Sequence, residues 1–210
     1  MNKTLDKVRK YILKENLFDK NKRIVLGVSG GADSICLFTI LNELKNEFNL
    51  ELEVVHINHL IREDASSDAN FVKSLCRKNN IPFHLFEKDV EKLAKELHIS
   101  TEDAGRRVRY EAFNEIAKDD ALIAVAHNSN DKVETFFLNL FRGSGINGLC
   151  SIQNRRDNII RPILCLSRKE IEAYLKEKNI EYKIDSTNNE CIYTRNKIRN
   201  EVIPYVEENI

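Results

Sequence analysis

Residues 24–41 read IVLGVSGGADSICLFTIL, and this segment predicts a buried strand that runs through a glycine-containing loop into a helix. Ile24 to Val28 is a continuous apolar run with β-branched residues, which is typical of a strand covered on both faces of a parallel sheet. Residues 35–44 carry apolar side chains at helical spacing. The loop is therefore expected at the carboxyl end of a parallel strand.

The loop has the composition of a phosphate-binding turn. Gly30 and Gly31 have no Cβ atom and tolerate positive φ, so several N–H groups can converge on one anion. The positive end of the following helix points to the same place. Neither a Walker Gly-Lys-Ser/Thr nor a G-x-G-x-x-G pattern is present. The alternative is an ordinary turn in which Asp33 and Ser34 cap the helix.

Asp33 indicates that a cation accompanies the phosphates. A carboxylate repels a phosphate unless a cation lies between them, so the pattern favours a polyphosphate bridged by Mg²⁺. We predict that the nucleotide is bound by Ser29, Gly30, Gly31, Ala32, Asp33 and Ser34.

The composition favours one α/β domain in a reducing compartment. The 210 residues suffice for a sizeable core. Since 33 basic residues balance 33 acidic ones, the net charge gives no indication of nucleic-acid binding, although a neutral total still permits a local basic patch. No apolar stretch is long enough to span a membrane and residues 1–15 show no signal peptide, which predicts a cytoplasmic protein without a membrane partner. The cysteines are odd in number and never in C-x-x-C spacing, which argues against zinc, iron–sulfur or disulfide frameworks. They are Cys36, Cys76, Cys150, Cys165 and Cys191.

Strands and helices alternate along the chain, which predicts a doubly wound, mostly parallel sheet with helices on both faces. In such sheets ligands bind at the carboxyl ends of the strands. Further strands are expected at residues 50–57, 81–86 and 121–126, and helices at residues 3–18, 64–80, 89–98, 100–118 and 167–178.

Polar residues follow two further strands and should converge with the loop on one crevice. They are the segments 56–62 and 127–135. In the second of these, Asp131 and Glu134 lie three residues apart and share one face of a helix. They could hold a metal ion or a cationic substrate such as an amine; the alternative is stabilisation of the helix dipole. His127 either contacts a phosphate, transfers a proton or is structural.

The helix over residues 100–118 carries basic residues on one face. Arg106 and Arg109 share that face, while Arg107 is displaced to the side. A charge run on a helix is usually solvated surface, but Arg beside Tyr110 also suits contacts to a phosphate and a base.

The loop matches the S-G-G-x-D-S pyrophosphate loop of the N-type ATP pyrophosphatases, the PP-loop superfamily with an adenine nucleotide alpha hydrolase-like fold. These enzymes cleave ATP to AMP and pyrophosphate. From about Arg23 to Pro204 the chain resembles the tRNA(Ile)-lysidine synthetase family. The motifs that carry the resemblance, in the same order, are His56-x-Asn-His59 with Arg62, residues 102–110, 127–135, 139–149, 160–164, 185–188 and 195–204.

The resemblance implies an ATP-dependent ligase that forms a carbon–nitrogen bond. Its partners would be ATP, Mg²⁺, L-lysine and tRNA(Ile) with a CAU anticodon, and the chain could act as a homodimer. The wobble cytidine is adenylated at C2 with release of pyrophosphate, and the lysine amine then displaces AMP. The residues implied in catalysis are Asp33, Arg106, His127, Asp131 and Glu134, with Mg²⁺ at Asp33. His56 would contact the nucleotide, and the substrate would be bound by Asn58, His59, Arg109, Arg142, Arg195 and Arg199.

Two departures from the family pattern stand out. Asn130 occupies a position where the family usually has Asp, which removes one formal charge. The chain ends at Ile210, where the family normally continues into helical tRNA-binding domains, so we expect a shortened or an unusually short version. The expected organisation is an N-terminal helix over 1–20, the catalytic domain over 21–185 and a tail over 186–210.

Three other functions remain as alternatives. A tRNA thiolation enzyme should show paired cysteines, GMP and NAD synthetases lack the arginine-rich helix and the Arg195-Asn196 tail, and a nucleotide-binding sensor needs no cluster of Asp131, Glu134 and Arg106.

Three late segments receive simpler interpretations. Residues 167–170 are read as a capping box without a functional role. Residues 142–145 are read as a flexible binding segment, with a helix C-cap at Gly143 as the alternative. A set of basic residues without matching acids is interpreted as a tRNA-facing strip, with solvated surface as the alternative. This set is Arg155, Arg156, Arg161, Arg168, Arg195, Lys197 and Arg199.

Overall fold

A computed structural model describes residues 2–60, 65–118, 120–183 and 194–209. Its described strands form one sheet in the order β3-β2-β1-β4-β6-β5, in which all neighbours pair in parallel except β5 with β6. The strands are β1 (Arg23–Gly27), β2 (Glu51–Asn58), β3 (Phe83–Glu87), β4 (Leu122–Ala124), β5 (Arg155–Arg156) and β6 (Ile159–Ile160).

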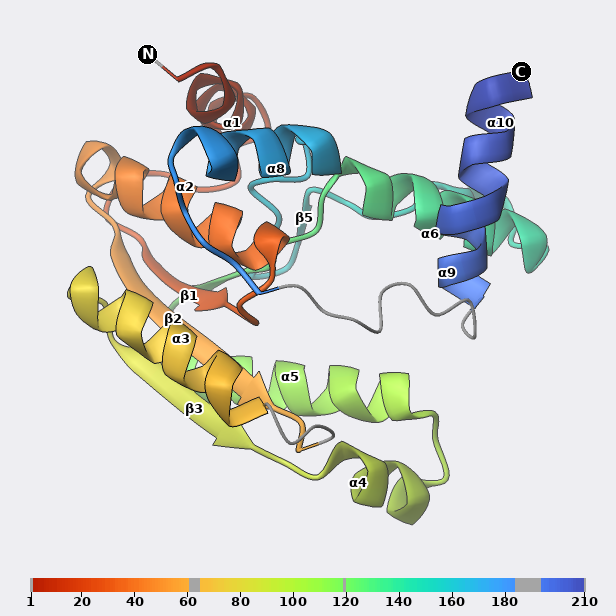
Figure 1. The fold of residues 1–210 in the computed structure, drawn as a ribbon, viewed down its shortest axis with the longest axis horizontal. Coiled ribbons are helices and arrows are strands. Elements are labelled where there is room, and N and C mark those ends of the chain that lie inside the picture. The colour runs from red at the N-terminus through yellow and green to blue at the C-terminus, as the bar shows by residue number, and fades with distance from the viewer. Residues whose placement is uncertain (1, 61–64, 119, 184–193, 210) are drawn as a thin grey trace.

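Helices connect and cover these strands (Figure 1). The α-helices are α1 (Lys3–Lys14), α2 (Ala32–Phe48), α3 (Ala65–Lys78), α4 (Val90–Leu97), α5 (Thr101–Ala117), α6 (Ser129–Phe141), α7 (Ile146–Leu149), α8 (Arg168–Glu177), α9 (Thr194–Lys197) and α10 (Ile203–Asn209), with a π-helical turn, η2, at Ile198–Val202. No helix in the described part of the chain is both long and apolar enough to cross a membrane.

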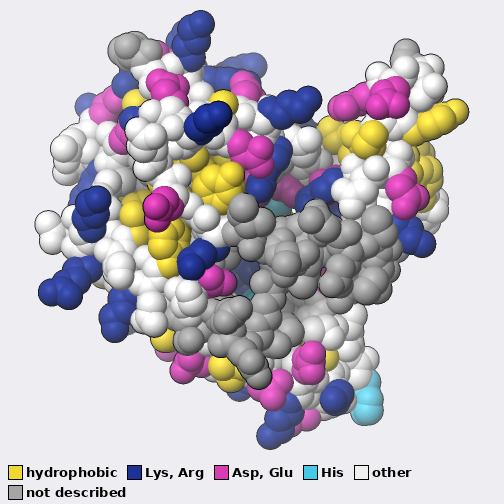
Figure 2. All heavy atoms as spheres, in the orientation of Figure 1, with side chains coloured by type: hydrophobic (Ala, Val, Ile, Leu, Met, Phe, Trp, Pro, Cys, Tyr) yellow, Lys and Arg dark blue, Asp and Glu magenta, His cyan; other side chains and the backbone are white. Residues whose placement is uncertain are grey.

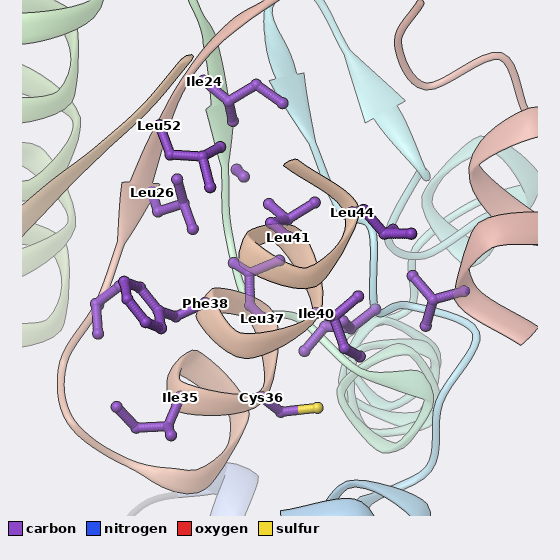
Figure 3. Close-up of a cluster of buried hydrophobic side chains, with 14 of the residues drawn as sticks. Ile24, Leu26, Ile35, Cys36, Leu37, Phe38, Ile40, Leu41, Leu44 and Leu52 are labelled. Carbon is purple, nitrogen blue, oxygen red and sulfur yellow. The ribbon is translucent and has the colours of Figure 1, made fainter. Parts of the chain in front are cut away.

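Alternate residues of the strands feed two cores on opposite faces of the sheet. Ile24 and Leu26 point into the larger core, which also contains buried residues of α1, α2 and α8 (Figure 3). Val25 points to the other face, where it joins Phe113 of α5 and Ile123 of β4. Since successive strand residues face opposite ways, a continuous apolar strand needs helices on both sides. The prediction of a doubly wound sheet is confirmed.

The strand order places the predicted loop where ligands bind in such sheets. β2 and β4 flank β1, so the chain proceeds from β1 to one side and later returns to the other. In open parallel sheets this reversal leaves a gap above the carboxyl ends of the two strands. The loop after β1 and the segment after β4 both begin at this edge.

One expectation about an element was wrong, and one pair of strands was not predicted. The first helix ends at Lys14 rather than residue 18, because Asn16 adopts left-handed backbone geometry (φ 47°) and Leu17 and Phe18 turn into the core. The β5–β6 hairpin was not predicted, since two-residue strands are too short to show a periodic pattern.

Candidate active site

The loop after β1 is held as a tight turn. Gly30 has a φ of +100°, a conformation that L side chains rarely adopt. The Ser34 hydroxyl accepts hydrogen bonds from the N–H groups of Ser29 and Gly30, both at 3.2 Å. It donates to the Gly31 carbonyl at 2.9 Å. The Ser34 oxygen thus gathers loop N–H groups in the way expected for an anionic oxygen.

A later segment supports the loop from outside. The N–H of Lys183 donates to the Gly30 carbonyl at 2.9 Å, and Lys183 pairs with Gly31 in a parallel bridge. The Lys183 ammonium lies 3.1 Å from the Ser67 hydroxyl of α3. The loop is therefore fixed between α2 and a chain segment about 150 residues later.

Asp33, in the first turn of α2, contacts the residue that caps the N-terminus of α6 and the first residue of α8. The Asn128 amide donates to its Oδ1 at 3.1 Å, and the Arg168 guanidinium donates to its Oδ2 at 2.7 Å. The backbone N–H of Arg168 also donates to Asn130 Oδ1 at 2.9 Å. Asn130 therefore joins α6 to α8 through its side-chain oxygen, a contact that an Asp carboxylate could also make.

The electrostatics of Asp33 suit a divalent cation. Burial raises the pKa of this carboxyl, the nearby Asp131 carboxylate raises it further, and Arg168 and Asn128 act in the opposite direction. The described residues contain no group of three or more His, Cys, Asp or Glu side chains that could hold a metal. Mg²⁺ commonly binds one or two protein carboxylates together with substrate phosphates. Asp33 beside the loop fits that donor set.

His56 and Asn58, which were expected to follow the second strand or end it, are buried residues of β2 itself, and only His59 and Leu60 of the described segment follow it. The His56 ring donates from Nδ1 to the Val28 carbonyl at 2.8 Å, which ties it to the strand that precedes the loop. The Asn58 amide donates to Glu87 at 3.1 Å and its Oδ1 accepts from the Leu60 N–H. His59 Nδ1 is buried and has no hydrogen-bond partner among the described residues. Arg62 lies outside the described residues.

His127 contacts an arginine that follows β6. Arg161 donates from Nε to His127 Nδ1 at 3.2 Å and from Nη1 to the Gln153 carbonyl at 2.8 Å. Only 7% of Arg161 is exposed. Burial chiefly lowers the pKa of His127, to about 4, so the ring is neutral at physiological pH.

Asp131 and Glu134 share one face of α6, as predicted, and both carboxylates already accept hydrogen bonds from other residues of the chain. Asp131 completes a capping box by accepting from the Asn128 N–H at 2.9 Å. Glu134 is 1% exposed and receives two hydrogen bonds from Arg199, at 2.6 and 3.0 Å. Arg195 approaches Glu134 at 3.6 Å and donates to the Thr135 hydroxyl at 3.0 Å. Asp131 thus stabilises the start of α6, which was the alternative predicted for it, and Glu134 binds the guanidinium groups of two arginines.

The remaining predicted residues lie on α5 and at the end of α6. Arg106 lies over the Tyr110 ring, 5.4 Å from its centroid. Arg107 pairs with Glu111 on the solvent side at 2.8 Å. Burial lowers the pKa of His59 and of His127, and the positive charge of Arg109 lowers both further. Arg142 caps the C-terminus of α6 and is followed by Gly143 with a φ of +71°. The C-cap alternative for this segment is therefore correct.

The basic residues of the predicted tRNA-facing strip were expected to have no matching acids, and for Arg168, Arg195 and Arg199 this was wrong. Arg168 pairs with Asp33 and Glu172, and Arg195 and Arg199 pair with Glu134. Basic and acidic side chains are interspersed over the face shown in Figure 2. The pairs with Asp33 and Glu134 were missed because they join residues far apart in the chain, whereas Arg168 and Glu172 lie four residues apart on α8. The predicted capping box of Ser167 and Glu170 is confirmed, and Arg168 within it additionally pairs with Asp33, a contact that was not predicted.

Three of the four described cysteines are poorly suited to metal or sulfur chemistry, while Cys150 is exposed. Burial raises the pKa of Cys36 far above its ordinary value, that of Cys76 to about 12 and that of Cys165 to about 11. The thiolate is the metal ligand and nucleophile, so these thiols are inert at neutral pH. Cys191 and the motif at 185–188 lie outside the described residues.

Comparisons with known proteins place the chain in a family of PP-loop domains. A family model described as the PP-loop domain matches residues 1–206, and the name of this family refers to ATP binding. A tRNA(Ile)-lysidine synthase from Caldanaerobacter subterraneus subsp. tengcongensis is 52% identical over 207 residues, covering 97% of this chain and 44% of that protein. The enzyme of the same name from Clostridium tetani is 48% identical over 209 residues, covering 98% and 45%. The chain thus spans less than half the length of these relatives.

A solved structure shares the fold. The U34-tRNA thiolase NcsA from Methanococcus maripaludis, solved with its [4Fe-4S] cluster, has a TM-score of 0.79 at 19% identity, covering 98% of this chain and 72% of that one. At this identity the likeness shows the fold alone. The relatives, in contrast, confirm the resemblance found in the sequence motifs.

Proposed function

This chain belongs to the PP-loop domain family, and we propose that it is an ATP-dependent ligase that joins lysine to C2 of the wobble cytidine of tRNA(Ile) with a CAU anticodon. The observation that carries the proposal is the junction at Asp33, where the loop, α6 and α8 are joined by hydrogen bonds to one carboxylate. This junction brings a nucleotide loop next to a pair of carboxylates that bind cationic groups.

The first step is adenylation of the base. The C2 oxygen of the cytidine attacks the α-phosphorus of ATP, and the bond to the pyrophosphate breaks. The N-terminus of α2 would stabilise the negative charge of the leaving group, and the N–H groups of Ser29 and Gly30 would do so once a phosphate oxygen replaces the Ser34 hydroxyl that accepts from them here. Asp33 would hold Mg²⁺, which neutralises phosphate charge when bound. Arg106 and Arg109 are proposed to contact the α-phosphate or the tRNA.

The second step joins lysine to the activated base. The amine nitrogen forms a bond to C2, the bond from C2 to the phosphate oxygen breaks, AMP leaves and the amine loses a proton. Asp131 and Glu134 are proposed to hold the charged amino groups of lysine. Because they bind Arg195 and Arg199 here, a lysine ammonium would have to share or replace these guanidinium contacts.

A thiolation enzyme is the second candidate, because a tRNA thiolase shares the fold. Such chemistry needs reactive or cluster-binding thiolates, whereas burial raises the thiol pKa at three of the four described cysteines, Cys36, Cys76 and Cys165. Ligation of lysine therefore remains the better-supported proposal.

The biological setting follows from these substrates. We propose a cytoplasmic location, a catalytic domain over residues 21–185 preceded by a helix over 1–20, and a tail over 186–210 that carries Arg195 and Arg199. His56 is proposed to contact the nucleotide, and Asn58, His59 and Arg142 the tRNA. The homodimer stays a proposal.

Product analysis tests this function. The chain is incubated with Mg²⁺, ATP and a tRNA(Ile) transcript, with and without lysine, and pyrophosphate and AMP are measured. Release should require the tRNA and be lost in Asp33→Ala, while Asp157→Asn, at a side chain that is 84% exposed, should match the wild type. Release of ADP and phosphate, or release that ignores the tRNA, would exclude the proposal.

A further inference from the structure

The contact between Arg161 and His127 fixes where the imidazole carries its proton. Arg161 follows β6 and His127 follows β4, two strands that lie side by side in the sheet. The guanidinium donates from Nε to His127 Nδ1 and is held from its other side by the Gln153 carbonyl. It is also buried. Neither group is free to turn away without losing a buried hydrogen bond.

The chemistry of the two side chains leaves one arrangement. A guanidinium has five N–H donors, no acceptor, and keeps its charge at all physiological pH values. Nδ1 of His127 must therefore present its lone pair to Arg161. Protonation of Nδ1 would break this bond and place two cations 3.2 Å apart. We propose that Arg161 is a positioning residue that keeps His127 neutral, with its single ring proton on Nε2.

The groups around the ring support this assignment. Burial is the largest cause of the lowered pKa of His127, and Asp131 on α6 opposes it. Three arginines add to the lowering: Arg161 after β6, Arg195 on α9 and Arg109 on α5. Cations thus outnumber the one carboxylate that acts on the ring.

The consequence for catalysis rests on the proposed function. A neutral ring with Nε2–H is a hydrogen-bond donor toward a phosphate or base oxygen. It cannot accept a proton from the lysine amine, because its only lone pair is bound to Arg161. Of the two active roles predicted from the sequence, phosphate contact and proton transfer, the geometry favours phosphate contact.

Nuclear magnetic resonance of the ¹⁵N-labelled chain tests the ring state without turnover, so its outcome is independent of the proposed function. Long-range ¹H–¹⁵N correlations distinguish protonated from unprotonated ring nitrogens, and the His127→Gln variant assigns the signals. We expect a protonated Nε2 and an unprotonated Nδ1 that persist from about pH 5 to about pH 8. A protonated Nδ1, or titration of the ring within that range, would overturn the proposal.

Two variants then test the role of Arg161. In Arg161→Met the pKa of His127 should rise by about one unit, because a buried cation beside the ring is removed. Arg161→Lys keeps a charge and a donor, and should restore the neutral ring. An Arg161→Met variant that folds and leaves the protonation pattern unchanged would contradict the proposal, and if it fails to fold, the wild-type spectrum decides alone.

Discussion

Arg168 Nη1 donates a hydrogen bond to Asp33 Oδ2 at 2.7 Å, although 135 residues separate them in the chain. The pair joins the first residue of α8 to the nucleotide loop. This hydrogen bond fixes the position of the Asp33 carboxylate beside the loop. Arg168 therefore belongs to the candidate site, although the sequence shows it only as part of a helix cap.

Replacement of Arg168 should impair the use of ATP. Arg168→Gln removes a charged hydrogen bond worth about 1.5–3 kcal/mol, so kcat/KM for ATP should fall roughly 10- to 100-fold. The matched control is Glu172→Gln, which removes the other ion pair of Arg168, at 2.7 Å, and should change this value less than about twofold. Equal effects of the two substitutions would show that Arg168 acts only through the stability of α8.

Removal of the Glu134 charge should weaken the binding of lysine. Glu134→Gln keeps the shape of the side chain but loses the charge that attracts an ammonium, so KM for lysine should rise roughly tenfold or more while KM for ATP stays close to that of the wild type. Glu111→Gln on the solvent side of α5 is the control. An unchanged KM for lysine would remove Glu134 from the proposed amine site.

A methyl group at Gly27 should destabilise the sheet. A Cβ at Gly27 would lie 2.4 Å from Cζ of the buried Phe113, so the ring or the elements that carry it would have to shift. Gly27→Ala should lower the free energy of unfolding by about 1–3 kcal/mol. At Gly145 an added Cβ has no atom within 4 Å among the described residues, so Gly145→Ala should change stability by less than about 0.5 kcal/mol. Urea unfolding measures both, and equal losses would contradict the packing argument.

Glu53 should make stability depend on pH. Burial alone would raise its pKa, but hydrogen bonds from Arg23 and His84 outweigh burial and lower it. A lowered native pKa means that the stabilisation is present above the unfolded pKa of about 4.3 and is lost as the pH falls through the native value. Glu53→Gln should cost about 1 kcal/mol at neutral pH, and this cost should shrink in acid. The exposed Glu51→Gln is the control, and a cost that does not vary with pH would contradict the linkage.

Patterns among neighbouring residues predicted those elements of the fold whose structure depends on neighbouring residues alone. The apolar run of β1, the glycine loop and the capping box at Ser167 each follow from neighbouring residues, and all three are present. The two-residue strands β5 and β6 left no such pattern, and the end of α1 depended on the left-handed turn at Asn16.

The chemistry of the site was harder to predict, because it depends on distant pairs. Segments after β1, β2 and β4 were expected to meet, since parallel strands share one carboxyl edge. Which side chains contact each other across that edge depends on side-chain reach, and spacing along the chain does not encode it. Arg161 with His127 and Arg199 with Glu134 are such pairs.

The most direct test of the proposed function is the mass of the wobble nucleoside after reaction. The chain is incubated with ATP, Mg²⁺, lysine and the tRNA(Ile) transcript, and the tRNA is digested and analysed by mass spectrometry. The account predicts that the wobble cytidine gains one lysyl group with loss of water, and that a transcript with uridine at that position gains nothing. A cytidine that stays unmodified, or a nucleoside that gains sulfur, would contradict it.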